Sequence, residues 1–86
     1  MRKNTLEIVN TILATVDLME LVELTGNVNE YSFEAKKIAE YLEKYEPSAK
    51  RLARYIRQTF VEYFGEMFDM ETCMMVADCI LKNLGE

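Results

Sequence analysis

The C-terminal stretch, residues 69–85, constrains the fold more than any other part of this chain. Its apolar residues recur at helical spacing, and only Glu71, Asp78 and Lys82 make a clearly polar face. A helix with so wide an apolar surface is normally enclosed by other helices. We therefore expect a central helix at residues 70–84, with the earlier helices packed around it. Its apolar stripe consists of Met70, Cys73, Met74, Ala77, Ile80, Leu81 and Leu84, widened by Val76.

Three earlier segments also have helical periodicity, and short turn signals separate them. Gly26 and Gly65 suit helix ends, Ser32 suits a helix start, and Pro47 ends one helix and suits the first turn of the next. Half of the 86 residues are hydrophobic, but only three are Gly and one is Pro, which favours long helices with few loops. The sequence predicts an all-α fold, a compact bundle of four helices at about 5–24, 33–45, 47–64 and 70–84, in a single domain covering residues 1–86.

The first of these helices contains a break in its apolar pattern. Glu20 and Glu23 would continue the face that earlier apolar residues form, while Leu18, Leu21 and Val22 point elsewhere. One interpretation is a kink near residues 15–17, with Asp17 and Glu20 capping a new short helix. The other is a straight helix whose displaced apolar residues meet a second partner, such as another subunit. We expect the straight helix, because no Gly or Pro marks a kink.

The two middle helices each have one apolar face. In the second helix this face includes two tyrosines, which we expect to point inward. The expected core residues of the second helix are Ala35, Ile38, Tyr41, Leu42 and Tyr45, and those of the third are Ala49, Leu52, Ala53, Ile56, Phe60 and Tyr63.

Charge is distributed unevenly along the chain. The formal net charge is −5, yet residues 36–57 contain seven basic and three acidic residues. The segments on either side are both acidic. A basic middle between acidic ends is the strongest compositional signal in this chain.

The third helix concentrates this basic charge opposite its apolar face. Lys50, Arg54 and Arg57 lie at i, i+4 and i+7, flanked by Arg51 and Gln58. We predict these five residues as the partner-binding site. This basic face has three interpretations. It binds an acidic protein partner, it binds nucleic acid, or it is an ordinary solvated face paired with neighbouring Glu side chains.

The nucleic-acid interpretation is a helix-turn-helix formed by residues 38–57. Ser48 would begin the recognition helix, so Lys50, Arg51 and Arg54 would meet phosphates or bases. However, Glu43 stands where the turn glycine of such a motif is usual, and Lys44 stands where an apolar residue is expected. The acidic segments on both sides would also repel DNA. An acidic protein is therefore the preferred partner.

A second candidate surface is apolar. Leu18, Leu21 and Val22 fall outside the main face of the first helix, and Phe68 and Met75 are expected near the surface or an interface. Methionine suits adaptable binding surfaces because its side chain is flexible and polarisable. These five residues form the alternative interface. The partner at this interface could be another protein or a second copy of the chain.

Catalysis, metal binding and cofactor binding have little support. The chain contains no His, which removes the commonest general base and metal ligand. Cys73 and Cys79 lie six residues apart on one predicted helix, so they cannot pair without breaking it. No Gly-rich stretch is suited to phosphate, and no acidic loop has calcium-binding spacing. We predict a protein that is not an enzyme and that has no cofactor.

The predicted function is a small, non-catalytic interaction protein, a regulator or inhibitor that binds another macromolecule through helix faces. No apolar run reaches membrane-spanning length and no signal peptide opens the chain, so a cytoplasmic location and no membrane association are expected. Compact acidic domains of this kind are common among bacterial and phage-encoded regulators. This link to regulators rests only on the general class of small acidic helical domains. The alternative is a helix-turn-helix DNA-binding regulator.

Overall fold

A computed structural model describes residues 4–85 of the chain. Five helices follow one another in this part: α1 (Thr5–Val16), α2 (Leu21–Thr25), α3 (Ser32–Tyr45), α4 (Ala49–Phe64) and α5 (Met70–Asn83). No strand occurs within residues 4–85. The predicted all-α class is therefore confirmed, and the last three predicted helices agree with the structure to within two residues at each end.

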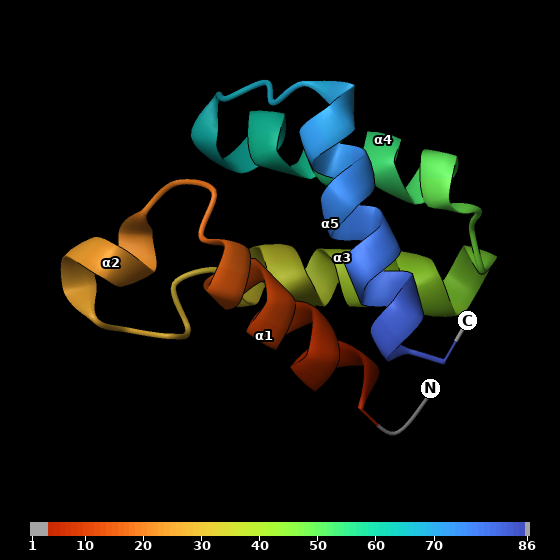
Figure 1. Cartoon of the computed structure of the whole chain (residues 1–86), viewed down its shortest axis with the longest axis horizontal. Helices are drawn as coiled ribbons and strands as arrows, with labels where there is room; N and C mark the ends of the chain where they lie inside the picture. The colour runs from red at the N-terminus through yellow and green to blue at the C-terminus, as the bar shows by residue number, and fades with distance from the viewer. Residues whose placement is uncertain (1–3, 86) are drawn as a thin grey trace.

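The four longer helices form a closed ring around the core (Figure 1). The pairs that pack together are α1 with α3, α3 with α4, α4 with α5, and α5 with α1. The expectation that the last helix is enclosed by the others is therefore wrong. One side of α5 remains open to solvent, where Glu71, Met75, Asp78 and Lys82 are exposed.

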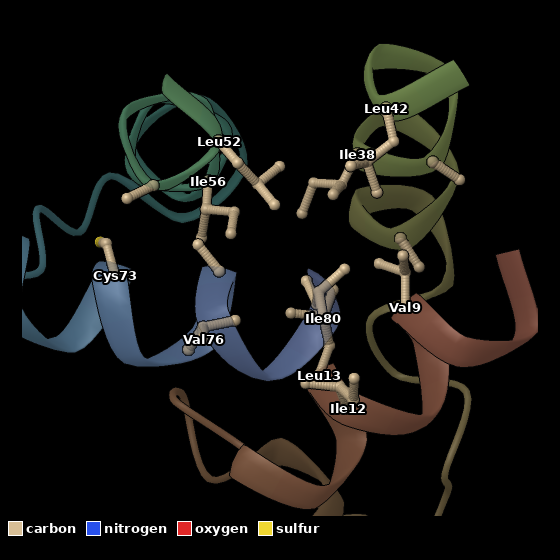
Figure 2. Packing of buried hydrophobic residues seen from close by; sticks show 14 of the residues in the cluster. Val9, Ile12, Leu13, Ile38, Leu42, Leu52, Ile56, Cys73, Val76 and Ile80 are labelled. Atoms are coloured by element: carbon tan, nitrogen blue, oxygen red, sulfur yellow. The ribbon is translucent and has the colours of Figure 1, made fainter. Parts of the chain in front are cut away.

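The core lies where the inner faces of α1, α3, α4 and α5 meet (Figure 2). Apolar residues at helical spacing supply it, as their periodicity predicts. Two predicted inward residues are exceptions: Tyr45 and Tyr63 are 52% and 45% exposed. The buried apolar residues of the four helices are Val9, Ile12, Leu13, Ala35, Ile38, Ala39, Leu42, Leu52, Ala53, Ile56, Phe60, Cys73, Val76, Ala77 and Ile80.

The first predicted helix is broken after Val16, so the expected straight helix over residues 5–24 is wrong. Asp17 has a left-handed backbone with φ 51°, which ends α1. Its carboxylate then accepts the N–H of Val22 at 3.0 Å and the N–H of Glu23 at 3.0 Å. Asp tolerates this conformation and caps free N–H groups, so it breaks the helix without Gly or Pro. The alternative interpretation, in which Asp17 caps a new short helix, is the one the structure supports.

A buried tyrosine holds this break against the rest of the bundle. The Tyr31 hydroxyl donates to Asp17 Oδ1 at 2.7 Å and accepts the N–H of Met19 at 2.9 Å. Its ring centre lies 6.0 Å from that of Phe60 and 6.2 Å from that of Phe64. Burial and the hydrogen bond to Asp17 raise the pKa of Tyr31 to about 12. Tyr31 thus joins the α1–α2 connection to α4.

Replacing Tyr31 with phenylalanine is expected to lower the free energy of unfolding by about 1–3 kcal/mol. The Asp17 carboxylate and the Met19 N–H would each lose their hydrogen bond to the hydroxyl. Tyr45→Phe is the matched control, because Tyr45 is 52% exposed, and it should stay within about 0.5 kcal/mol of the wild type. Urea denaturation of both variants provides the measurement. Equal stability of Tyr31→Phe and wild type would show that the hydroxyl does not hold the α1–α2 connection.

Candidate functional site

A tight turn brings the end of α3 beside the start of α4. Glu46 adopts a left-handed backbone with φ 44° and ends α3, and Pro47 is buried in the turn. Ser48 then caps α4, because its Oγ accepts the N–H of Arg51 at 3.3 Å. The turn therefore places the last residues of α3 next to the first two turns of α4.

Three tyrosines gather at this α3–α4 junction. The rings of Tyr41 and Tyr55 are stacked, with centres 3.9 Å apart and planes 5° from parallel. The Tyr45 ring is tilted against the Tyr41 ring, with the ring centres 5.1 Å apart. Lys44 Nζ lies 5.3 Å from the centre of the Tyr45 ring. Such aromatic pairs are rigid, and the lysine adds a cation–π contact. The result is a fixed aromatic platform that is partly exposed to solvent.

Cationic side chains surround this platform. Two shallow hollows, of about 510 Å³ and 340 Å³, adjoin it and share Tyr41, Arg51 and Tyr55. We call their combined lining the basic–tyrosine surface. It consists of Lys37, Glu40, Tyr41, Lys44, Tyr45, Arg51, Arg54, Tyr55 and Gln58. Four of these nine side chains carry positive charge and one carries negative charge.

The cations at the centre of this surface lack carboxylate partners. Within residues 4–85, the ion pair present is Lys37 with Glu62, whose charged atoms are 3.6 Å apart. The Glu62 charge is also the main cause that raises the pKa of Lys37. Arg51 and Arg54 are exposed and make no ion pair with any residue of the described chain. The interpretation that this basic face simply pairs with neighbouring Glu side chains therefore does not fit the arginines.

The structure separates the five predicted partner-binding residues. Arg51, Arg54 and Gln58 lie together on the basic–tyrosine surface. Lys50 is exposed on the same helix but lines neither hollow. Arg57 is half-buried on the α5 side, where burial raises the pKa of the Cys73 thiol and the Arg57 charge acts to lower it.

The tyrosines are the part of this surface that the sequence reasoning missed. Tyr41 and Tyr45 were expected in the core, and Tyr55 had no assigned role. Tyr41 is half-buried and Tyr45 is exposed, because both lie at the edge of the inward face of α3. A detectable signal exists in the sequence: two tyrosines at i and i+4 precede Pro47, and Tyr55 follows it among Arg51 and Arg54.

The second candidate surface is largely used by the chain itself. Leu18, Leu21 and Val22 are half-buried against the core. Phe68 is half-buried too, with its ring centre 5.6 Å from that of Phe60 in an edge-to-face contact. Met75 is 50% exposed on α5 and lines a shallow hollow there. Of the five residues, Met75 is the one that remains open to a partner.

A buried carboxylate lies apart from both surfaces, in the first turn of α3. Glu34 is 4% exposed, and its Oε1 has no hydrogen-bond partner within the described chain. Burial raises its pKa above the ordinary value of 4.5. Because the folded state favours the protonated form, Glu34 stabilises the fold at low pH, and this contribution is lost as pH rises through the folded-state pKa.

Glu34→Gln is expected to raise the free energy of unfolding at about pH 7 by roughly 1 kcal/mol, because it removes a buried negative charge. At about pH 3, well below the ordinary pKa of 4.5, the difference from wild type should be small, since Glu34 is then protonated in both states. Urea denaturation over this pH range tests the prediction, with the exposed Glu40→Gln as control. A stability difference that does not change with pH would contradict it.

The described part of the chain offers little for other classes of site. Among residues 4–85, no group of three or more His, Cys, Asp or Glu side chains is placed to hold a metal ion, and both cysteines are free. None of the helices in this range has the length and apolar character to cross a membrane. No protein-family model, curated protein or solved structure matches this chain.

Proposed function

We propose that this protein is a small, cytoplasmic, non-catalytic interaction protein, a regulator or inhibitor that binds an acidic protein partner through the basic–tyrosine surface. The observation that carries the proposal is the pair Arg51 and Arg54, exposed without carboxylate partners beside a rigid tyrosine cluster. Cations of the same sign gathered at one site attract an anionic partner.

The chemistry of the surface supports a protein as the partner. Tyr and Arg are enriched at protein interfaces and among the residues that contribute most binding energy. Tyr41 and Tyr55 already hold each other in place, so little side-chain entropy is lost when a partner covers them. Arginine guanidinium groups bind carboxylates in a bidentate manner, which gives orientation as well as attraction.

A second candidate function is a helix-turn-helix DNA-binding regulator. It is favoured by the three-residue turn between α3 and α4 and by the exposed Lys50, Arg51 and Arg54 near the start of α4. Against it, Glu40 lines the same surface and the segments on both sides are acidic. Carboxylates near a phosphate backbone weaken binding, so the acidic protein partner is preferred.

Fluorescence anisotropy with two labelled probes tests the proposal: an acidic peptide of about 20 residues rich in Glu and Leu, and a duplex DNA of about 20 base pairs. We expect the peptide to bind in low salt and the DNA to bind at least tenfold more weakly. Steep, salt-sensitive binding of DNA with no binding of the peptide would instead support the helix-turn-helix alternative.

Charge reversal locates the binding on the molecule. Arg51→Glu/Arg54→Glu is expected to weaken peptide binding about tenfold or more, since both cations lie on the basic–tyrosine surface. The matched control is Lys36→Glu/Lys82→Glu, which changes the net charge equally at two exposed positions outside that surface. If both variants lose binding to the same extent, net charge alone explains it and the proposed site is wrong.

A further inference from the structure

A second surface stands at the end of the molecule that contains α2. It includes three of the most exposed large apolar side chains: Leu24, Val28 and Phe33 are 79%, 59% and 73% exposed. Glu20 and Glu23 are exposed on the same segment. We call residues 20–33 the α2 lobe. Between residues 4 and 35 the chain contains no Lys or Arg, so the lobe is uniformly acidic.

Three apolar residues of the lobe, Leu24, Val28 and Phe33, do not serve the core of their own chain, whereas Leu21, Val22 and Tyr31 pack against it or within it. No residue of α2 is buried, and α2 packs closely against no other helix of the described chain. Figure 1 shows α2 standing off from the four-helix ring. The lobe is nevertheless held in place, because Asp17 caps α2 and binds the buried hydroxyl of Tyr31. A fixed, exposed and apolar segment is typical of an interaction surface.

The two surfaces of this chain are complementary in charge and lie at opposite ends. The α2 lobe is at one end of the molecule and the α3–α4 turn at the other (Figure 1), along a longest dimension of 32 Å. A single chain therefore cannot bring them together. We infer that the acidic partner of the basic–tyrosine surface is the α2 lobe of a second copy of this chain. This inference rests on the proposed function and names the partner.

The contact unites charge pairing with apolar burial. Glu20 and Glu23 of one copy meet Arg51 and Arg54 of the next, and the apolar side chains of the lobe cover the exposed faces of the tyrosine cluster. Each copy presents a lobe and a basic–tyrosine surface, so the contact is head-to-tail. Such contacts build rings or open chains, and their charged component weakens as salt increases.

Sedimentation velocity of the full chain tests this inference. We expect the mean mass to rise between about 1 µM and about 500 µM protein in low salt and to fall toward that of the monomer in high salt. Glu20→Lys/Glu23→Lys and Arg51→Glu/Arg54→Glu should each remain monomeric. An equimolar mixture of the two variants should assemble again, because the intact lobe of one variant meets the intact basic–tyrosine surface of the other, and the two reversed surfaces are also complementary in charge.

Two further variants separate this contact from general charge effects and from misfolding. Glu71→Lys/Asp78→Lys changes two exposed acidic residues of α5 and should assemble at least as well as the wild type. Leu24→Asn/Phe33→Asn leaves the charge unaltered and should weaken assembly about tenfold or more. Circular dichroism checks that each variant is folded.

A wild-type chain that stays monomeric throughout, or a variant mixture that does not assemble, would overturn the inference. Loss of assembly in the α5 control equal to that in the lobe variant would overturn it as well. If the monomeric chain still binds the acidic peptide through Arg51 and Arg54, the proposed function stands and only the identity of the partner is wrong. If peptide binding also fails, the proposed function falls with it.

Discussion

Replacing Phe60 with alanine is expected to lower the free energy of unfolding by about 3–5 kcal/mol. Phe60 is buried on α4, and its ring contacts Tyr31, Phe64 and Phe68 with centres 6.0, 5.5 and 5.6 Å away. The truncation removes apolar area from the core and leaves a cavity among rings that cannot easily close it. A loss of this size is a large part of the total stability expected for a domain this small.

Phe33→Ala is the matched control, because it makes the same chemical change in a helix at a side chain that is 73% exposed. Its free energy of unfolding should stay within about 0.5 kcal/mol of the wild type. Urea denaturation of the two variants at a protein concentration where the chain is monomeric gives the comparison. Similar losses for both variants would mean that the arrangement of α4 against the core is wrong.

Reversing Arg51 and Arg54 to glutamate is expected to slow association with the acidic peptide about tenfold or more in low salt. The two guanidinium groups lie unpaired at the surface, so their charge acts on the partner before contact as well as within the complex. Folding stability should change by only about 0.5 kcal/mol, since neither side chain is buried. The double variant should also lose most of the dependence of the association rate on salt.

Stopped-flow measurement of the association rate at several salt concentrations tests this prediction. Lys36→Glu/Lys82→Glu again serves as control and should retain most of the rate and its salt dependence. An unchanged association rate in the double variant, with the loss appearing only in the dissociation rate, would show that the arginines act after contact and not as the attracting charge.

Helical periodicity was sufficient to predict the helical class and most of the core. The residues that recur at i, i+3 and i+4 on α4 and α5, such as Ile56, Phe60 and Ile80, are buried as expected. Helix-start signals agreed in part: the Ser48 hydroxyl accepts the N–H of Arg51, whereas α3 has Tyr31 at its N-cap and no side-chain cap. These features are local, so they can be recognised from the sequence alone.

The break at Asp17 shows where such local reasoning fails. The apolar pattern changes after Asp17, which can cap a new helix, but the absence of Gly and Pro favoured a straight helix. Besides the local cap on the N–H groups of Val22 and Glu23, the break is held by Tyr31, fourteen residues away, whose hydroxyl donates to Asp17. A tertiary hydrogen bond of this kind outweighs local preference, and spacing within one helix does not reveal it.

The candidate site was predicted only in part, because its α4 residues follow from local spacing and its α3 residues depend on tertiary packing. Arg51, Arg54 and Gln58 lie on one face of α4, which their spacing indicates. The contribution of α3 depends on how the turn at residues 46–48 sets the two helices side by side. Only that packing stacks Tyr41 on Tyr55, while Arg57 lies on the side of α4 near Cys73 of α5.

The most direct test of the central claim, that the basic–tyrosine surface is the binding surface, is to map amide chemical shifts during titration with the acidic peptide. The shifts are expected to be concentrated on the second half of α3, the turn at residues 46–48 and the first half of α4. The amides of Tyr45, Arg51 and Tyr55 should be among those most affected. Shifts centred instead on the outer face of α5, around Met75 and Lys82, would contradict the claim.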